Sequence, residues 1–254
     1  MSVRIVTHVF ARDLPQYAVF LRAQLSSLVL HKPKVRTAIT VCLCSEEDPE
    51  VVRVCNEFRI RYPGLGLQAL DLSLGDLFRR SIGRNRAALR QGEDLVWFTD
   101  VDYVFGPGCI DELWRQEQNL ESFGMVWPNS VLINPDYEAA DKFWQVNRTA
   151  TWCIEPDTTG FVEKKYNRAI GGVQVVRGSF AREFGYLRNF AKWQTPQSPE
   201  KPFPCFRDDI AFRSVCQKQG VLVPVSVPNL IRLRHSRITY KSGNNSAAPS
   251  YNEG

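Results

Sequence analysis

The sequence has no apolar run long enough to cross a membrane. A membrane helix needs about 20 consecutive apolar residues, and no hydrophobic stretch of this 254-residue chain approaches that length. The first residues, MSVRIVTHVFARD, also lack the apolar core and the cleavage site of a secretory signal. We therefore expect a protein without a membrane span, located in the cytoplasm.

Paired cysteines are also missing. The chain has seven scattered cysteines, an odd number, and no Cys-x-x-Cys pair. Cys42 and Cys44 alone would make a poor zinc site, so we expect reduced thiols, as in cytoplasmic proteins. A glycine-rich phosphate loop is absent too, which argues against a nucleotidyltransferase.

A strong charge of either sign is lacking. The formal net charge is only +5, and the basic residues are dispersed. This balance favours anionic ligands such as nucleotide phosphates, but it does not require nucleic acid. The hydrophobic content of 44% is ordinary for a soluble protein of this length, which can bury a real core.

The first half of the chain alternates between two kinds of hydrophobic pattern. Short β-branched runs predict strands, and apolar stripes at helical spacing predict helices. The expected strands are 3–10, 37–44, 65–72 and 95–98; the expected helices are 13–28, 48–59 and 73–92, the last interrupted near Gly83. This alternation predicts a single α/β domain with a mostly parallel, Rossmann-like sheet and helices on both faces.

The second half is richer in aromatic residues and less regular. We expect short β-like pieces within 125–170, a strand and then a helix within 169–187, a proline-rich loop at 192–206 and a helix at 207–220. The last residues, 238–254, form a polar segment that we expect to be a flexible tail.

Two carboxylates follow the apolar strand in the segment LVWFTDVDYVF. Side chains alternate along an extended chain, so Asp100 and Asp102 are expected to point the same way. Like charges this close need a cation or hydrogen-bond donors between them. A divalent metal at a strand end is one explanation, and an acidic cap before a turn is the other. Ligands of parallel α/β sheets bind beyond the carboxyl ends of the strands, which favours the metal.

Four motifs in this order carry a resemblance to a known family. FTDVD, AIGGVQVVRGSF, RDDIAFR and RLRHSR together resemble the GT-A glycosyltransferases, and more narrowly the family 2 and beta-1,4-galactosyltransferase-like enzymes. The resemblance implies a GT-A domain at 1–237, with a nucleotide-binding half at 1–110 and an acceptor-binding half at 111–237. It also implies transfer of a sugar from a nucleotide-sugar donor, with UDP as the expected nucleotide, to a hydroxyl acceptor.

The resemblance implies a divalent metal, Mn²⁺ or Mg²⁺, that would bridge the donor diphosphate. Asp102 corresponds to the family's metal ligand, Asp100 to a residue that serves the ribose or the metal's water shell, and His235 to a histidine that completes the coordination. The alternative for His235 is a surface histidine between arginines. The galactosyltransferase branch has a methionine where this chain has Arg232, which favours magnesium over a thioether-assisted manganese site.

The donor is expected to bind several further segments. Arg84 and Asn85 match residues that hold the nucleotide and the donor sugar, and guanidinium groups suit phosphate; the alternative is a solvated basic helix face. Gly171 and Gly172 are expected to let the backbone approach the donor sugar, and Trp193 to stack against the acceptor. Weaker nucleotide contacts are expected from Thr7, Phe10, Arg12 and Glu46.

Catalysis is expected at the start of the 207–220 helix. Inverting enzymes of this fold place a carboxylate there to deprotonate the acceptor hydroxyl, and Asp208 or Asp209 is the candidate base. The family's spacing from Arg213 falls on Arg207, so either Asp208 acts with a shift of one position or the mechanism differs; two acids that cap a helix remain the alternative. Two other functions also stay open: glycosylation of a modified nucleic-acid base, and nucleotide-sugar binding without catalysis.

Overall fold

The structure, a computed structural model, describes residues 2–10, 15–90, 92–197 and 207–235. Within these ranges the main feature is a seven-stranded sheet in the order β10-β6-β9-β4-β1-β2-β3. Its strands are β1 (Ser2–His8), β2 (Arg36–Leu43), β3 (Leu67–Asp71), β4 (Leu95–Phe98), β6 (Met125–Pro128), β9 (Gln174–Arg177) and β10 (Leu222–Val225). The first four strands are parallel to one another, whereas β9 runs antiparallel to both β4 and β6.

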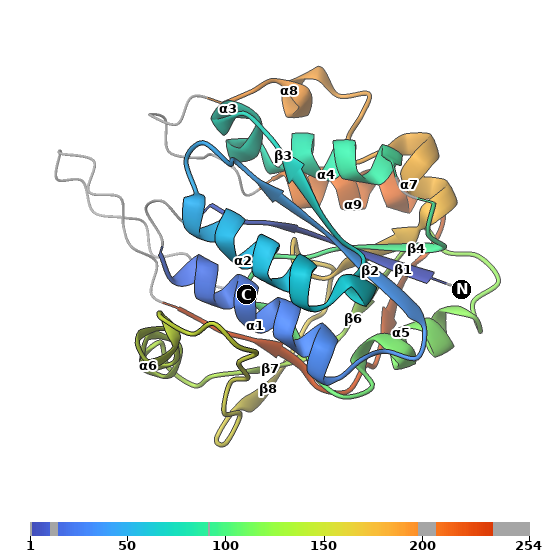
Figure 1. The fold of residues 1–254 in the computed structure, drawn as a ribbon. Coiled ribbons are helices and arrows are strands. Elements are labelled where there is room, and N and C mark those ends of the chain that lie inside the picture. Colours follow the sequence, from blue (N-terminus) through green and yellow to red (C-terminus); the bar gives the residue numbers. More distant parts are fainter. Residues whose placement is uncertain (1, 11–14, 91, 198–206, 236–254) are drawn as a thin grey trace, which may run out of the picture.

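Helices cover both faces of this sheet (Figure 1). The helices α1 (Gln16–Leu30) and α2 (Pro49–Arg61) pack side by side on one face, and α4 (Arg80–Arg90), α7 (Gly178–Phe184) and α9 (Asp208–Gln219) lie on the other. Short helices α3 (Leu74–Phe78) and α8 (Ala191–Gln194) lie beside α4. The mostly parallel α/β architecture that the alternating pattern predicted is confirmed.

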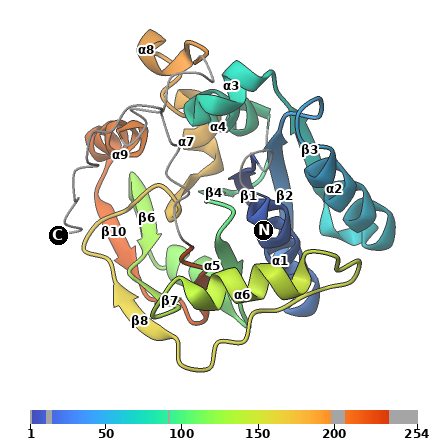
Figure 2. The same cartoon turned by 90° about the vertical axis from the view of Figure 1, so that its left-hand side faces the viewer.

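A second, four-stranded sheet has the order β5-β11-β7-β8. It consists of β5 (Tyr103–Phe105), β7 (Ser130–Ile133), β8 (Val162–Lys165) and β11 (Leu230–Arg232). Figure 2 shows it below the main sheet, next to α6 (Glu138–Asn147), while α5 (Cys109–Glu117) follows β5. β11 pairs antiparallel with β5 directly after the Asp-Val-Asp segment, so it brings the last described residues close to those two acids.

One hydrophobic core extends from Val3 to Leu233 and joins both halves of the chain. The strands β1 and β4 are fully buried, which explains why they read as continuous apolar runs. Among the described residues, none of the helices combines the length and the apolar character that crossing a bilayer requires. The boundary between halves at residue 110 stays a prediction, and the tail at 238–254 lies outside the described residues.

The interruption predicted near Gly83 is at the wrong place. The break between α3 and α4 falls at Arg79, and Gly83 lies inside α4. A Cβ atom at Gly83 would come within 2.3 Å of Nε2 of His8, so glycine is needed here for the close approach of β1 and α4. The loop predicted at 192–206 is also partly wrong, because residues 192–194 belong to α8.

Candidate functional site

The two acids of the Asp-Val-Asp segment lie at the carboxyl end of β4 but bind different arginines. The chain turns here, and the NH group of Tyr103 donates to the carbonyl oxygen of Asp100 at 3.3 Å. The extended conformation that we expected through these residues is therefore wrong. Asp100 is 30% exposed and accepts hydrogen bonds from α4, whereas the Asp102 side chain is 8% exposed and accepts one from Arg232 at 2.9 Å.

Arg80 links the acid at the end of β4 to an acid at the start of α9. Its Nη1 donates to Oδ1 of Asp100 at 3.0 Å, and its Nη2 and Nε donate to Asp208 at 2.9 and 3.3 Å. Arg84 donates to the same Asp100 oxygen at 3.0 Å. Burial alone would raise the pKa of Asp100, but the charges of Arg80, Arg84 and Arg232 together bring it below its usual value.

The two acids at the start of α9 differ in their surroundings. Asp208 is 4% exposed and binds Arg80 with both carboxylate oxygens. Asp209 is less buried, and among the described residues its carboxylate accepts one hydrogen bond, from the NH group of Ile210 at 2.8 Å. Burial raises the pKa of Asp209; Arg80 opposes this, and the charge of Asp208 adds to the rise. Which of the two acids acts as the base stays a prediction.

The start of α9 is held against the sheet by Gln174. Its side-chain NH2 group donates to the main-chain carbonyl oxygen of Asp209 at 3.0 Å, and its side-chain oxygen accepts a hydrogen bond from the Tyr186 hydroxyl at 2.9 Å. Because β9 is antiparallel, its first residue lies opposite Phe98, at the carboxyl end of β4. The antiparallel strand thus places the α9 acids beside the Asp-Val-Asp segment.

Arg84 and Asn85, the two expected donor contacts on α4, are turned into the protein. Arg84 is fully buried and donates to Asp100, to the Thr99 carbonyl and to the Tyr186 hydroxyl. Asn85 is 9% exposed; its side-chain oxygen accepts a hydrogen bond from the NH group of Tyr186, and its side-chain NH2 group donates to the side-chain oxygen of Gln194. Arg84 and Asn85 therefore do not form the solvated basic helix face that was the alternative interpretation. Both residues instead join α4 to the sheet and to the following loops.

The glycine pair at 171–172 makes room for two side chains. A Cβ atom at Gly172 would lie 2.2 Å from the Tyr103 ring, and one at Gly171 would lie 3.1 Å from Nη2 of Arg80. The pair therefore allows Tyr103 and Arg80 to reach the site. Approach of the donor to this backbone stays a prediction.

Residues at the carboxyl ends of β1 and β2 lie on the same edge of the sheet. Thr7 is fully buried and its hydroxyl has no partner among the described residues. The Phe10 ring lies 4.6 Å from the ring of Phe78, and Glu46 is exposed in the turn after β2. Arg12 lies outside the described residues. A nucleotide contact from these residues stays a prediction.

Sequence reasoning missed His8, at the end of β1. Both of its ring nitrogens are buried and have no hydrogen-bond partner in the described ranges. Burial lowers its pKa well below the usual value, and the charges of Arg84 and Arg80 lower it further, so the ring is neutral. His8 lies inside the strand predicted at 3–10, and no pattern around this single histidine indicates that its ring is buried beside two arginines.

Trp193, the expected stacking platform for an acceptor, is only 9% exposed. Arg79 lies 5.8 Å and Lys192 5.4 Å from its ring. Its carbonyl oxygen accepts the hydroxyl of Ser81. Trp193 therefore anchors α8 to α4, and its contact with an acceptor stays a prediction.

The described residues contain no group of three or more His, Cys, Asp or Glu side chains that could hold a metal by themselves. One atom does fit a hard cation: Oδ1 of Asp102 is buried and has no hydrogen-bond partner within the described ranges. The His235 ring lies 5.1 Å from the ring of Tyr17 and 5.5 Å from that of Phe20 on α1. Its predicted role as a ligand is not tested by these contacts.

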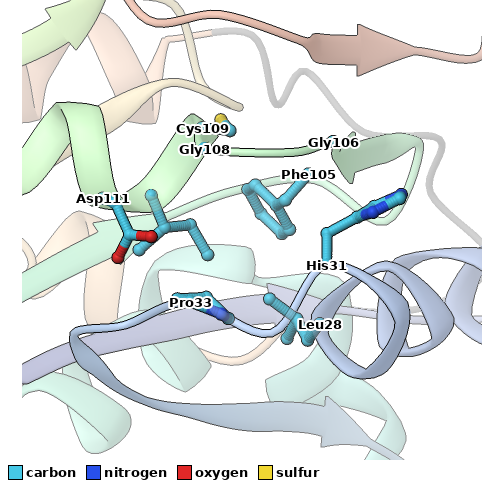
Figure 3. Close-up of a pocket in the computed structure, with 9 residues that line it drawn as sticks. Leu28, His31, Pro33, Phe105, Gly106, Gly108, Cys109 and Asp111 are labelled. Atoms are coloured by element: carbon cyan, nitrogen blue, oxygen red, sulfur yellow. The ribbon is translucent and has the colours of Figure 1, made fainter.

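Figure 3 shows a small pocket that lies away from the acids and arginines described above. It lies where α1 ends, between Leu28, His31 and the β5–α5 connection. Its carboxylate, on Asp111, accepts hydrogen bonds from the NH groups of Lys34 and Val35 at 2.9 to 3.1 Å, so it joins the first turn of α5 to the loop before β2. The helix α1 starts near the carboxyl end of β1 and runs back for about 22 Å. This pocket therefore lies near the amino ends of the parallel strands, away from the Asp-Val-Asp segment.

Comparison with solved structures finds the same fold in glycosyltransferases. The mannosyltransferase PcManGT from Pyrobaculum calidifontis, solved in complex with GDP-Man and Mn²⁺, aligns with 92% of this chain and 57% of its own, at 13% identity and a TM-score of 0.51. A structure of S. aureus TarS, residues 1–349, aligns with 91% of this chain and 60% of its own, at 12% identity and a TM-score of 0.50.

The chain thus spans less than two thirds of the length of either structure. No protein-family model matches the sequence, and no curated protein sequence matches it either. At this level of identity the likeness concerns the fold alone. The chain has the GT-A fold.

Proposed function

We propose that this protein transfers a sugar from a nucleoside-diphosphate sugar to a hydroxyl acceptor, with inversion at the anomeric carbon. The observation that carries the proposal is the position of Asp209, a carboxylate with a raised pKa, beside the Asp-Val-Asp segment. The fold it shares with PcManGT, which was solved with a nucleotide sugar, supports the donor class.

In the proposed step Asp209 takes the proton of the acceptor hydroxyl. The acceptor oxygen attacks the anomeric carbon, the bond from that carbon to the diphosphate oxygen breaks, and the nucleoside diphosphate leaves. A base works best when its pKa approaches the working pH, which the burial of Asp209 favours. Asp208, paired with Arg80 through both oxygens, is the less suitable base and is proposed to position that arginine.

A divalent ion, Mn²⁺ or Mg²⁺, is proposed at Asp102. The ion would supply positive charge to the leaving diphosphate. Asp102 offers its free Oδ1, Asp100 keeps one oxygen outside its two arginine contacts, and His235 follows closely after Leu233, whose NH group donates to the Asp102 carbonyl oxygen at 2.8 Å. Magnesium is commonly bound by one or two carboxylates together with substrate phosphates and water, so this small donor set suits it.

The nucleotide is proposed to lie over the ends of β1 and β2, in the half of the chain before residue 110. Thr7 and His8 present unpaired polar atoms there, and Phe10 with Phe78 offers aromatic surface. UDP remains the proposed nucleotide. The acceptor is proposed to enter from the side of Asp209. No contact in the described structure favours a nucleic-acid acceptor over a glycan.

The test is a screen of UDP-sugars and GDP-mannose for release of the nucleoside diphosphate, with and without chelator. Asp209→Asn should lower kcat by about 10²- to 10⁴-fold while calorimetry shows unchanged donor binding. Asp157, an exposed loop acid, provides the control Asp157→Asn, which should behave like the wild type. Normal turnover by Asp209→Asn, or an α-linked product from an α-linked donor, would contradict the proposal.

A further inference from the structure

Arg232 is held next to the Asp-Val-Asp segment by the backbone. It is the last residue of β11, where it pairs with Tyr103 of β5, and the NH group of the following Leu233 donates to the Asp102 carbonyl oxygen at 2.8 Å. Its guanidinium carbon lies 5.4 Å from the centroid of the Tyr103 ring. Two strands and an aromatic ring therefore fix where this side chain begins and how it lies.

The Arg232 guanidinium is only partly used by the protein. Its Nε donates to Oδ2 of Asp102 at 2.9 Å. Its Nη1 and Nη2 make no hydrogen bond with any described residue, and neither is among the buried unpaired atoms. The side chain as a whole is 27% exposed. Four N–H donors are therefore left for a ligand at this edge of the sheet.

The other two arginines of the site do not have this freedom. All three nitrogens of Arg80 donate to Asp100 or Asp208. Arg84 is fully buried, with both Nη atoms hydrogen-bonded inside the protein. Among these three side chains, Arg232 has the most N–H donors left for an anion: one of its five is hydrogen-bonded, against three of five in Arg80.

We propose that Arg232 binds the diphosphate of the donor directly, through Nη1 and Nη2, and that this contact does not require the metal ion proposed at Asp102. This inference rests on the proposed function for the identity of the anion. A guanidinium donates two parallel hydrogen bonds to a phosphate, and Arg232 keeps its orientation through Nε while it does so. The carboxylate of Asp102 opposes this binding, because its negative charge partly cancels that of Arg232.

The test measures binding of inorganic pyrophosphate by calorimetry in excess chelator, which needs neither a known sugar nor a metal. The wild type should bind, and Arg232→Gln should weaken the affinity by about 10- to 100-fold, the range for loss of charged hydrogen bonds. Arg234→Gln is the matched control: it removes the same charge two residues away, where the guanidinium lies over the Tyr137 ring, and it should leave the affinity unchanged.

Two further variants keep the test decisive if Arg232→Gln folds poorly because Asp102 is left unpaired. Asp102→Asn should bind pyrophosphate in chelator more tightly than the wild type, since it removes the opposing charge. Adding Arg232→Gln to that variant should then lose the affinity without leaving a buried carboxylate unpaired. An unchanged affinity of Asp102→Asn in chelator would contradict the inference, because Asp102 would then not act on the anion bound by Arg232.

Several results would overturn the inference: no pyrophosphate binding by the wild type in chelator, equal affinity of Arg232→Gln and wild type, or an equal loss in Arg234→Gln. The outcome is separate from that of the proposed function. If pyrophosphate binding depends on Arg232 but no nucleotide sugar is turned over, the anion site stands and the proposed reaction fails. If sugar transfer occurs but the affinity for pyrophosphate does not depend on Arg232, the proposed reaction stands and the anion site fails.

Discussion

Replacing Arg80 by methionine should lower the free energy of unfolding as well as the rate of the proposed reaction. The guanidinium makes three hydrogen bonds to two carboxylates, one on Asp100 and two on Asp208. Asp100 keeps a second partner in Arg84, but within the described residues Asp208 pairs with no other cation, and its side chain is 5% exposed. The variant would therefore leave a buried carboxylate without its partner, which is costly because a charge is poorly solvated there.

The exposure of the groups sets the expected magnitude. Surface ion pairs contribute about 0 to 1 kcal/mol, and breaking a buried pair costs about 3 to 5 kcal/mol. The Arg80 side chain is 26% exposed and that of Asp208 is 5% exposed, so the pair falls between these cases. We expect the free energy of unfolding to fall by about 2 to 4 kcal/mol. Asp208→Asn in the same variant should restore about 1 to 2 kcal/mol, because a neutral amide costs less to bury unpaired.

Urea denaturation followed by circular dichroism at pH 7 measures these differences. Arg86→Met is the matched control on the same helix: Arg86 pairs with Asp76 at 2.8 Å, but its side chain is 43% exposed. It should cost no more than about 1 kcal/mol. If Arg80→Met costs no more than this control, or if the double variant is no more stable than Arg80→Met alone, the electrostatic reasoning is wrong.

Three other predictions concern the same site. Arg84→Met should lower the free energy of unfolding by about 2 to 4 kcal/mol, because it removes a fully buried guanidinium from an ion pair whose carboxylate, Asp100, is 30% exposed; an effect on donor affinity alone would contradict this. Gly172→Ala should cost about 1 to 3 kcal/mol, since the new methyl group meets a buried tyrosine ring at 2.2 Å, whereas Gly171→Ala meets the end of a flexible side chain and should cost less in the same urea assay. The acidic limb of the pH profile of kcat/KM should lie above pH 4, the usual range of aspartate, because the pKa of Asp209 is raised. Asp208→Asn removes a neighbouring negative charge and should move the acidic limb of the residual activity to lower pH. An unchanged or raised limb in this variant would exclude Asp209 as the base.

Much of the architecture followed from local patterns in the sequence. The apolar runs that became β1, β2 and β4 and the helical stripes that became α1 and α2 are strong periodic signals. The order of these elements predicted a mostly parallel sheet, and the carboxyl end of β4 was correctly expected to hold two acids. These features depend on neighbouring residues, so the sequence carries them directly.

The roles of the arginines could not be predicted in this way. We expected Arg84 to contact the donor, and that contact stays a prediction; what the sequence did not indicate is that the close packing of α4 against β1, which Gly83 permits, buries its guanidinium. Arg80, one turn earlier on the same helix, instead reaches the acids of two distant segments. Which arginine of a basic helix faces a site depends on how the helix is rotated against the sheet, and that rotation is a tertiary property.

The sequence by itself thus determined the α/β class and the acids at the ends of β4 and at the start of α9, because spacing and periodicity act over a few residues. Only the tertiary structure decided which charges meet. The antiparallel insertion of β9 between β4 and β6 brings Asp209 to the site, and the pairing of β11 with β5 brings Arg232 to Asp102 across 130 residues. Contacts between segments so far apart depend on the closure of the whole sheet, which no local pattern records.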